Sequence, residues 1–105
     1  MTEKEFNEII NDRLKKIVLT LRAKGKEYAS NDDRLHNFKR AAEMLRCSHE
    51  KALMGMLAKH MVSIMDMVDE VEAAGDNPYP MKLWEEKLGD AINYLILLEA
   101  IVKEK

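Results

Sequence analysis

Acidic side chains recur at helical spacing in two apolar segments of the chain. Asp66 and Glu70 are four residues apart in the first segment, and Glu86 and Asp90 are four apart in the second. Residues four apart lie on one face of a helix, so each pair directs two carboxylates to the same side. Because a buried, unpaired carboxylate is strongly disfavoured, each pair must bind a cation, pair with a basic residue or face solvent.

Two interpretations of these carboxylates are open. In the first, all four converge as oxygen ligands of Mg²⁺, which prefers a few carboxylates together with waters and phosphate oxygens. Asp66, Glu86 and Asp90 are then the candidate catalytic residues. In the second, the carboxylates form an internal salt-bridge network, in which Asp66 pairs with Lys87 and His60 hydrogen-bonds to a buried neighbour.

Basic, amide and aromatic side chains near the carboxylates have the chemistry to bind a nucleotide. An ammonium group neutralises phosphate, and an amide or an aromatic ring recognises a base or sugar by hydrogen bonding or stacking. The candidate substrate-binding residues are Lys26, Tyr28, Asn37, Phe38, Lys59, His60, Lys87 and Asn93. If the site is catalytic, we expect metal-activated water to attack a phosphoanhydride.

Apolar periodicity predicts the helices that position these residues. Thr2 and Glu5 have the spacing of a capping box, and the apolar residues that follow predict a helix over residues 3–23. Residues 24–32 are polar and turn-rich, which favours a loop that would be a candidate binding loop. Apolar residues from Leu35 to Leu45 then predict a short second helix.

Two longer helices follow. Ser48 is a suitable N-cap and Gly75 a suitable end for the third helix, and Pro80 fits the first position of the fourth. The short connection between them predicts an antiparallel hairpin. We therefore expect an all-α fold, a four-to-five-helix bundle around this central hairpin, in a single domain over residues 1–105.

The registry of this hairpin would bring the polar residues of both helices together. If the connection is centred near Asn77, Asp66 lies near the level of residues 87–90, and Ser63 near residues 90–94. This spacing predicts that the acidic faces of the third and fourth helices meet.

Composition excludes several classes of protein. The net charge of -2 is spread along the 105 residues, so no basic surface indicates duplex DNA. Cys47 is the single cysteine of the sequence, so it cannot form an internal disulfide. No apolar run reaches the roughly 20 residues that a membrane-spanning helix requires. The expected location is therefore cytoplasmic. P-loop, Rossmann, nucleophile-elbow and zinc motifs are absent from the sequence.

Four sequence segments resemble a known family when they are taken in order. They are Lys24-Gly25-Lys26-Glu27-Tyr28, Asn37-Phe38-Lys39-Arg40-Ala41-Ala42, Lys59-His60 and the stretch from Trp84 to Leu95. Over about residues 20–102 the chain resembles the nucleotide modification associated domain family, first type, which contains small helical proteins that are frequent in phages and prophages. The resemblance implies a nucleotide-handling protein in the cytoplasm of the host cell.

The layout is also similar to that of the MazG-type all-α nucleoside triphosphate pyrophosphatases. Those enzymes hold Mg²⁺ with acidic residues on two helices and release pyrophosphate. By position, Asp66 and Glu70 correspond to part of their first acidic motif, and Glu86 with Asp90 to the second. This chain departs from both motifs, since it has Asp66-Met-Val-Asp69-Glu70 in place of Glu-Glu-x-x-Glu and a spacing of four in place of three.

A non-catalytic function is the alternative. Residues 95–102 are apolar on nearly every side of the last helix, more than one small chain is expected to bury. We therefore expect a homo-oligomer, and the alternative protein is a helical module for oligomerisation or protein interaction.

Overall fold

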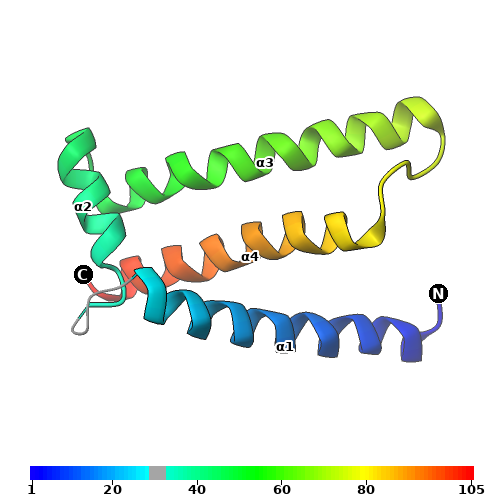
Figure 1. Ribbon diagram of the computed structural model, residues 1–105, viewed down its shortest axis with the longest axis horizontal. Helices are drawn as coiled ribbons and strands as arrows, with labels where there is room; N and C mark the ends of the chain where they lie inside the picture. Colours follow the sequence, from blue (N-terminus) through cyan, green and yellow to red (C-terminus); the bar gives the residue numbers. More distant parts are fainter. Residues whose placement is uncertain (29–32) are drawn as a thin grey trace.

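The computed structural model describes the backbone of residues 1–28 and 33–105 and the side chains of residues 1–23 and 33–105. Four helices account for most of this chain: α1 (Glu3–Tyr28), α2 (His36–Leu45), α3 (His49–Ala74) and α4 (Met81–Lys103). The described residues contain no strand. The fold is an all-α bundle in which α3 and α4 form the predicted antiparallel hairpin (Figure 1).

Local hydrogen bonds explain where three of these helix ends lie. Thr2 and Glu5 form the predicted capping box: the Thr2 amide donates to Glu5 Oε2 at 2.9 Å and the Glu5 amide to Thr2 Oγ1 at 3.1 Å. Ser48 Oγ accepts from the Lys51 amide at 3.1 Å and caps α3. Gly75 ends α3 with φ at 70°, a left-handed conformation that glycine adopts without strain.

The first helix is longer than the sequence predicted. It continues to Tyr28, so a loop over residues 24–28 is wrong, while residues 29–32 lie outside the described residues. A single glycine in a helix interior costs only about 1 kcal/mol relative to alanine, and Lys and Glu are good helix formers. Gly25 is therefore insufficient to end α1.

Pro80 is the N-cap of α4 and not, as the sequence predicted, its first helical residue. Its φ of -65° and ψ of 145° make it the N-cap of α4, and its carbonyl accepts from the Leu83 amide at 3.0 Å. The first helical residue is Met81. Because proline lacks an N–H group, it fits a position at which no backbone donor is needed.

Helix α4 is central, since it packs against both α3 and α1, and α2 packs across α3 (Figure 1). The largest cluster of buried apolar side chains lies where α2 meets the hairpin; it comprises Leu35, Phe38, Leu53 and Ile101, with Met56, Tyr94, Leu97 and Leu98 packed around it. This cluster fixes the position of α2 and therefore of the polar residues that α2 carries.

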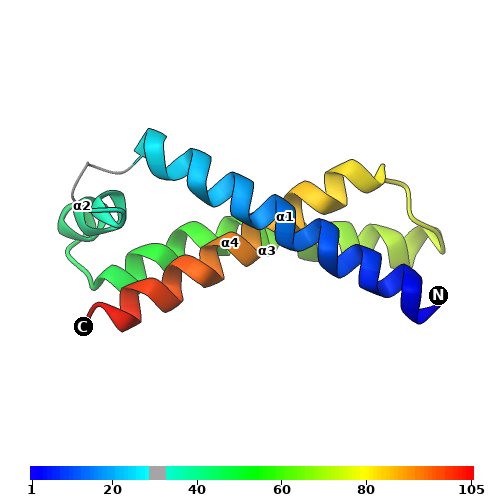
Figure 2. The same ribbon diagram turned by 90° about the horizontal axis from the view of Figure 1, so that it is seen from below.

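Apolar packing is incomplete along α4. Ala91 is buried, whereas Leu88 is 39% and Leu95 52% exposed. The α1 helix crosses α4 at an angle (Figure 2), and these side chains line a groove between α1, α3 and α4. No helix within the described ranges is long and apolar enough to cross a membrane.

Candidate functional site

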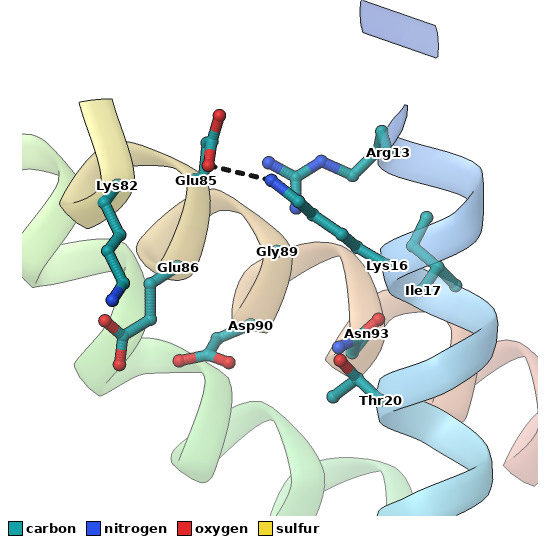
Figure 3. Close-up of a pocket in the computed structure, with 10 residues that line it drawn as sticks. All are labelled: Arg13, Lys16, Ile17, Thr20, Lys82, Glu85, Glu86, Gly89, Asp90 and Asn93. Carbon is teal, nitrogen blue, oxygen red and sulfur yellow. Dashed lines mark hydrogen bonds and ion pairs between the residues drawn. The ribbon is translucent and has the colours of Figure 1, made fainter. Parts of the chain in front are cut away.

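A pocket of about 310 Å³ lies between α1 and α4, and we call it the charged pocket (Figure 3). It is lined by Arg13, Lys16, Ile17, Thr20, Lys82, Glu85, Glu86, Gly89, Asp90 and Asn93. Three cationic and three anionic side chains thus surround one cavity. This composition suits a ligand that carries negative charge together with a counter-cation.

A second pocket of about 310 Å³ adjoins the first, and we call it the aromatic pocket. Its lining residues are Leu21, Arg34, Asn37, Phe38, Met56, Asp90, Asn93, Tyr94 and Leu97. Asp90 and Asn93 line both pockets, so the two cavities meet at these side chains. The structure therefore brings the predicted residues Asn37, Phe38, Asp90 and Asn93 together.

Asn93 is the one buried polar residue among the described side chains, at 8% exposure. Its Oδ1 atom is inaccessible and has no hydrogen-bond partner in the described part of the chain. A buried acceptor without a donor costs about 1–3 kcal/mol. A ligand or water with an N–H or O–H group at this junction would remove that penalty.

His60 of α3 lies beside Asp90. His60 Nδ1 lies 3.7 Å from Asp90 Oδ2, and both side chains are largely covered. The imidazole also packs against Tyr94, with the ring centroids 5.0 Å apart. The sequence predicted Asp66 and Ser63 near this level; the α3 side chain that contacts Asp90 is His60, three residues before Ser63.

The rings of Phe38 and Tyr94 form one wall of the aromatic pocket. They meet edge to face, with centroids 6.4 Å apart. Arg34 borders the same pocket and donates from Nη2 to the Leu21 carbonyl at 3.3 Å, which ties the start of α2 to α1. An apolar, aromatic pocket edged by amides is suited to a planar heterocycle.

In the charged pocket, one ion pair joins the two facing helices. Lys16 Nζ lies 2.8 Å from Glu85 Oε2 (Figure 3). Hydrogen bonding to this ammonium lowers the pKa of Glu85. Both side chains are about half exposed, so the pair contributes little stability and is open to exchange with another anion.

Gly89 lies directly beneath the Arg13 side chain of α1. A Cβ atom built at Gly89 would lie 2.5 Å from Arg13 Nη1, closer than van der Waals contact permits. Only glycine therefore leaves room for the Arg13 guanidinium at its present position over α4.

Several of the predicted site residues lie outside the two pockets. Asp66 and Glu70 lie near Tyr79, whose pKa is raised by its hydrogen bond to Glu70 and by the nearby charge of Asp66. Lys59 is exposed and Lys87 half-buried, and neither lines the two pockets. Asp66 and Lys87 do not form an ion pair in the described structure.

The four predicted metal ligands do not form one group. Glu86 and Asp90 line the charged pocket, whereas Asp66 and Glu70 lie by Tyr79. Across residues 1–23 and 33–105, no three His, Cys, Asp or Glu side chains are clustered closely enough to hold a metal ion together. Lys26 and Tyr28 were also predicted to bind the substrate, and their side chains lie outside the described residues.

Sequence reasoning missed the contribution of α1 and the start of α2. Arg13, Lys16 and Thr20 follow one another at steps of three and four, so they share a helix face, and Arg34 lies just before α2. That spacing was a usable signal, but it does not reveal which helix the face meets.

Comparison with known protein families, curated proteins and solved structures finds no match for this chain. The functional interpretation therefore depends on the residues of the two pockets.

Proposed function

We propose that the charged and aromatic pockets form one binding site for a phosphorylated nucleotide. The base and sugar occupy the aromatic pocket, and the phosphates occupy the charged pocket. The two cavities adjoin at Asp90 and Asn93, and together they are apolar and aromatic at one end and charged, with both signs present, at the other.

The observation that carries this proposal is the unpartnered Oδ1 atom of Asn93. It is buried at the junction of the two pockets, where the structure offers it no donor. A nucleotide has donors at this point, either a ribose hydroxyl or an exocyclic amine of the base. Hydrogen bonding to such a group satisfies the amide and selects a ligand that spans both pockets.

Cationic groups on two helices are available for the phosphates. Arg13 and Lys16 come from α1 and Lys82 from α4. Phosphate oxygens compete with Glu85 for the Lys16 ammonium, and the half-exposed Lys16–Glu85 pair opposes this exchange only weakly. The Arg13 guanidinium suits bidentate contact with a phosphate.

Mg²⁺ fits this site through Glu86 and Asp90. Two carboxylates with phosphate oxygens and waters are a normal ligand set for Mg²⁺, which seldom uses a complete cage of protein ligands. When bound, the ion neutralises phosphate charge and activates water for attack on a phosphoanhydride. His60, 3.7 Å from Asp90, is the neighbour on α3 that would interact with this carboxylate. Asp66 and Glu70 have no part in this proposal.

Pyrophosphohydrolysis of a nucleoside triphosphate, as the resemblance to MazG-type enzymes implies, is the reaction that we propose if the site is catalytic. A cytoplasmic location and a phage context belong to the same proposal. The second candidate is a non-catalytic module that forms homo-oligomers or binds another protein. It is favoured by the many exposed apolar side chains of α1, α3 and α4.

Thermal unfolding tests the nucleotide site. We expect a panel of ribo- and deoxyribonucleotides with Mg²⁺ to contain one class that raises Tm, because a ligand bound only by the native state stabilises it, by about 2.7 kcal/mol at 100 times its Kd. Asp90→Asn and Asn93→Leu should each abolish the Tm shift, the former by removing the charge of a metal ligand and the latter by removing the amide.

Asp69→Asn is the matched control, since it neutralises an exposed carboxylate of α3 away from both pockets. It should retain the full shift. If no nucleotide at millimolar concentration changes the Tm of the wild-type protein, the proposal is wrong. Release of pyrophosphate from the stabilising nucleotide then separates hydrolysis from binding.

A further inference from the structure

The two pockets of the candidate site differ in chemistry, and Asn93 is one of two residues that line both. On one side Phe38 and Tyr94 present aromatic rings, and on the other Arg13 and Lys16 present cations. In a nucleotide, the sugar is the part that is bonded to both the base and the phosphates. A nucleotide that fills both pockets therefore places its sugar near Asn93.

The Asn93 amide lacks a partner at this junction. Its side chain comes from the side of α4 that faces α1 (Figure 3). The residue is 8% exposed, and its Oδ1 atom accepts no hydrogen bond from the described part of the chain. Two donors that line the pockets are engaged elsewhere, since Lys16 pairs with Glu85 and Arg34 donates to the Leu21 carbonyl. The junction thus holds a buried acceptor that needs a donor.

The kind of donor follows from the position of the junction. Exocyclic amines lie on the hydrogen-bonding edge of a base, several bonds away from the atom that joins the base to the sugar. A base in the aromatic pocket therefore carries its amines away from the charged pocket. The 2′ and 3′ hydroxyls of the sugar lie between the base and the phosphates, and each has an O–H group that can donate.

We propose, on the basis of the nucleotide site described above, that Asn93 Oδ1 accepts a hydrogen bond from a sugar hydroxyl of the bound nucleotide. A site with a buried acceptor discriminates against an analogue that lacks the donor, because binding that analogue leaves the acceptor unpaired. The site therefore takes nucleotides with a free 2′ or 3′ hydroxyl and rejects 2′,3′-dideoxynucleotides.

The same oxygen makes the free protein less stable than an apolar residue would. Asn93 is buried on α4, the central helix, where leucine has nearly the same shape and needs no hydrogen-bond partner. Residues that lower the stability of the free protein are expected at binding sites, where the ligand supplies the missing interaction. A purely structural amide would instead contribute to stability.

Thermal unfolding of the free protein tests the unpaired oxygen. Asn93→Leu should raise Tm without nucleotide by about 4 °C or more, because it removes a buried acceptor that has no donor. Asn11→Leu is the control, since it makes the same replacement at an exposed position of α1 and measures the gain from helix propensity alone. A Tm of Asn93→Leu at or below that of Asn11→Leu would overturn the proposal, because Oδ1 then has a partner in the free protein.

Binding of sugar analogues tests the hydroxyl. Calorimetry with Mg²⁺ compares ATP, GTP, CTP and UTP with their 2′-deoxy, 3′-deoxy and 2′,3′-dideoxy forms. The dideoxy form should bind at least about tenfold more weakly than one of the two monodeoxy forms, and the stronger monodeoxy form identifies the hydroxyl that Asn93 binds. In Asn93→Leu this preference should be lost, so that the dideoxy and monodeoxy forms bind equally weakly.

The outcomes distinguish this inference from the proposed function. A dideoxynucleotide that binds wild-type protein as tightly as both monodeoxy forms contradicts the role of Asn93 and leaves the nucleotide site standing. A preference for the hydroxyl that persists in Asn93→Leu has the same meaning. If no nucleotide binds the wild-type protein, both the nucleotide site and the role of Asn93 are wrong.

Discussion

Two regions of this bundle differ in how completely they bury their apolar residues. Where α2 meets the hairpin, Leu35, Phe38, Leu53 and Ile101 form a closed cluster. In the groove between α1, α3 and α4, Phe6, Leu14 and Leu95 are each more than half exposed. Both regions are rich in apolar residues; the difference is that α2 packs across α3 over the cluster, whereas α1 leaves the groove open in the described part of the chain. Apolar sequence alone thus does not make a core, because burial requires a second layer.

The candidate site borders both regions. The aromatic pocket takes part of its wall from the closed cluster, through Phe38 and Met56, and the charged pocket is formed by α1 and α4. One pocket is therefore built on closed packing, and the other depends on α1, which packs mainly against α4. Substitutions in the two regions should differ in size and in kind.

The largest effect is expected in the closed cluster. Leu53→Ala should reduce the free energy of unfolding by about 2–5 kcal/mol, because Leu53 is fully buried and its truncation leaves a cavity. Leu45→Ala makes the same chemical change at a residue that is 65% exposed, and it should alter stability by no more than about 0.5 kcal/mol. Urea denaturation measures both, and similar losses in the two variants would contradict the assignment of a closed core.

An intermediate effect is expected at Gly89. Gly89→Ala should raise helix stability by up to about 1 kcal/mol while it displaces the Arg13 side chain, which is flexible enough to move. In Gly55→Ala the new Cβ meets no atom within 4 Å, so this control should give a similar gain in stability without any displacement. Thermal unfolding with nucleotide separates them: only Gly89→Ala should reduce the ligand-induced Tm shift. An equal shift in both variants would exclude Arg13 from the site.

The smallest effect concerns ion pairs near the closed cluster. Lys39 pairs with Asp33 at 2.8 Å and with Glu104, and hydrogen bonding to Lys39 lowers the pKa of Asp33. A lowered carboxyl pKa contributes stability above the unfolded value of about 4, and this contribution is lost as the pH falls through the lower folded value. Lys39→Met should therefore be less stable than wild type at pH 7 and close to it at pH 2.5.

Tm measured across this pH range tests the prediction. Lys103→Met is the control, because Lys103 pairs with Glu99 in a fully solvated position where the pair contributes little. The Tm of Lys103→Met should differ little from that of the wild-type protein at every pH. A difference for Lys39→Met that is independent of pH would show that the residue acts by packing of its aliphatic chain.

Much of the fold could be predicted from local chemistry. The capping box at Thr2 and Glu5, the N-cap Ser48 and the left-handed Gly75 act within one helical turn, so the sequence specifies them without knowledge of any neighbour. The length of α1 could not be predicted in the same way, because the small cost of Gly25 is outweighed by residues around it.

The candidate site was predicted in part. Asn37, Phe38, Asp90 and Asn93 meet as expected from their residue types, but Asp66 and Glu70 lie beside Tyr79 instead. Spacing identifies the face of a helix on which a residue lies and leaves open the level at which two helices meet. The contact between His60 and Asp90 was therefore not foreseen from spacing.

The sequence by itself determined the all-α fold class, the α3–α4 hairpin and most helix ends, because periodicity and capping are local properties. Only the tertiary structure decided that Arg13 and Lys16 of α1 face Glu85 and Asp90, that the oxygen of Asn93 is buried without a donor, and that one apolar face is left uncovered. These features depend on how helices cross, which is set by packing between residues far apart in the chain.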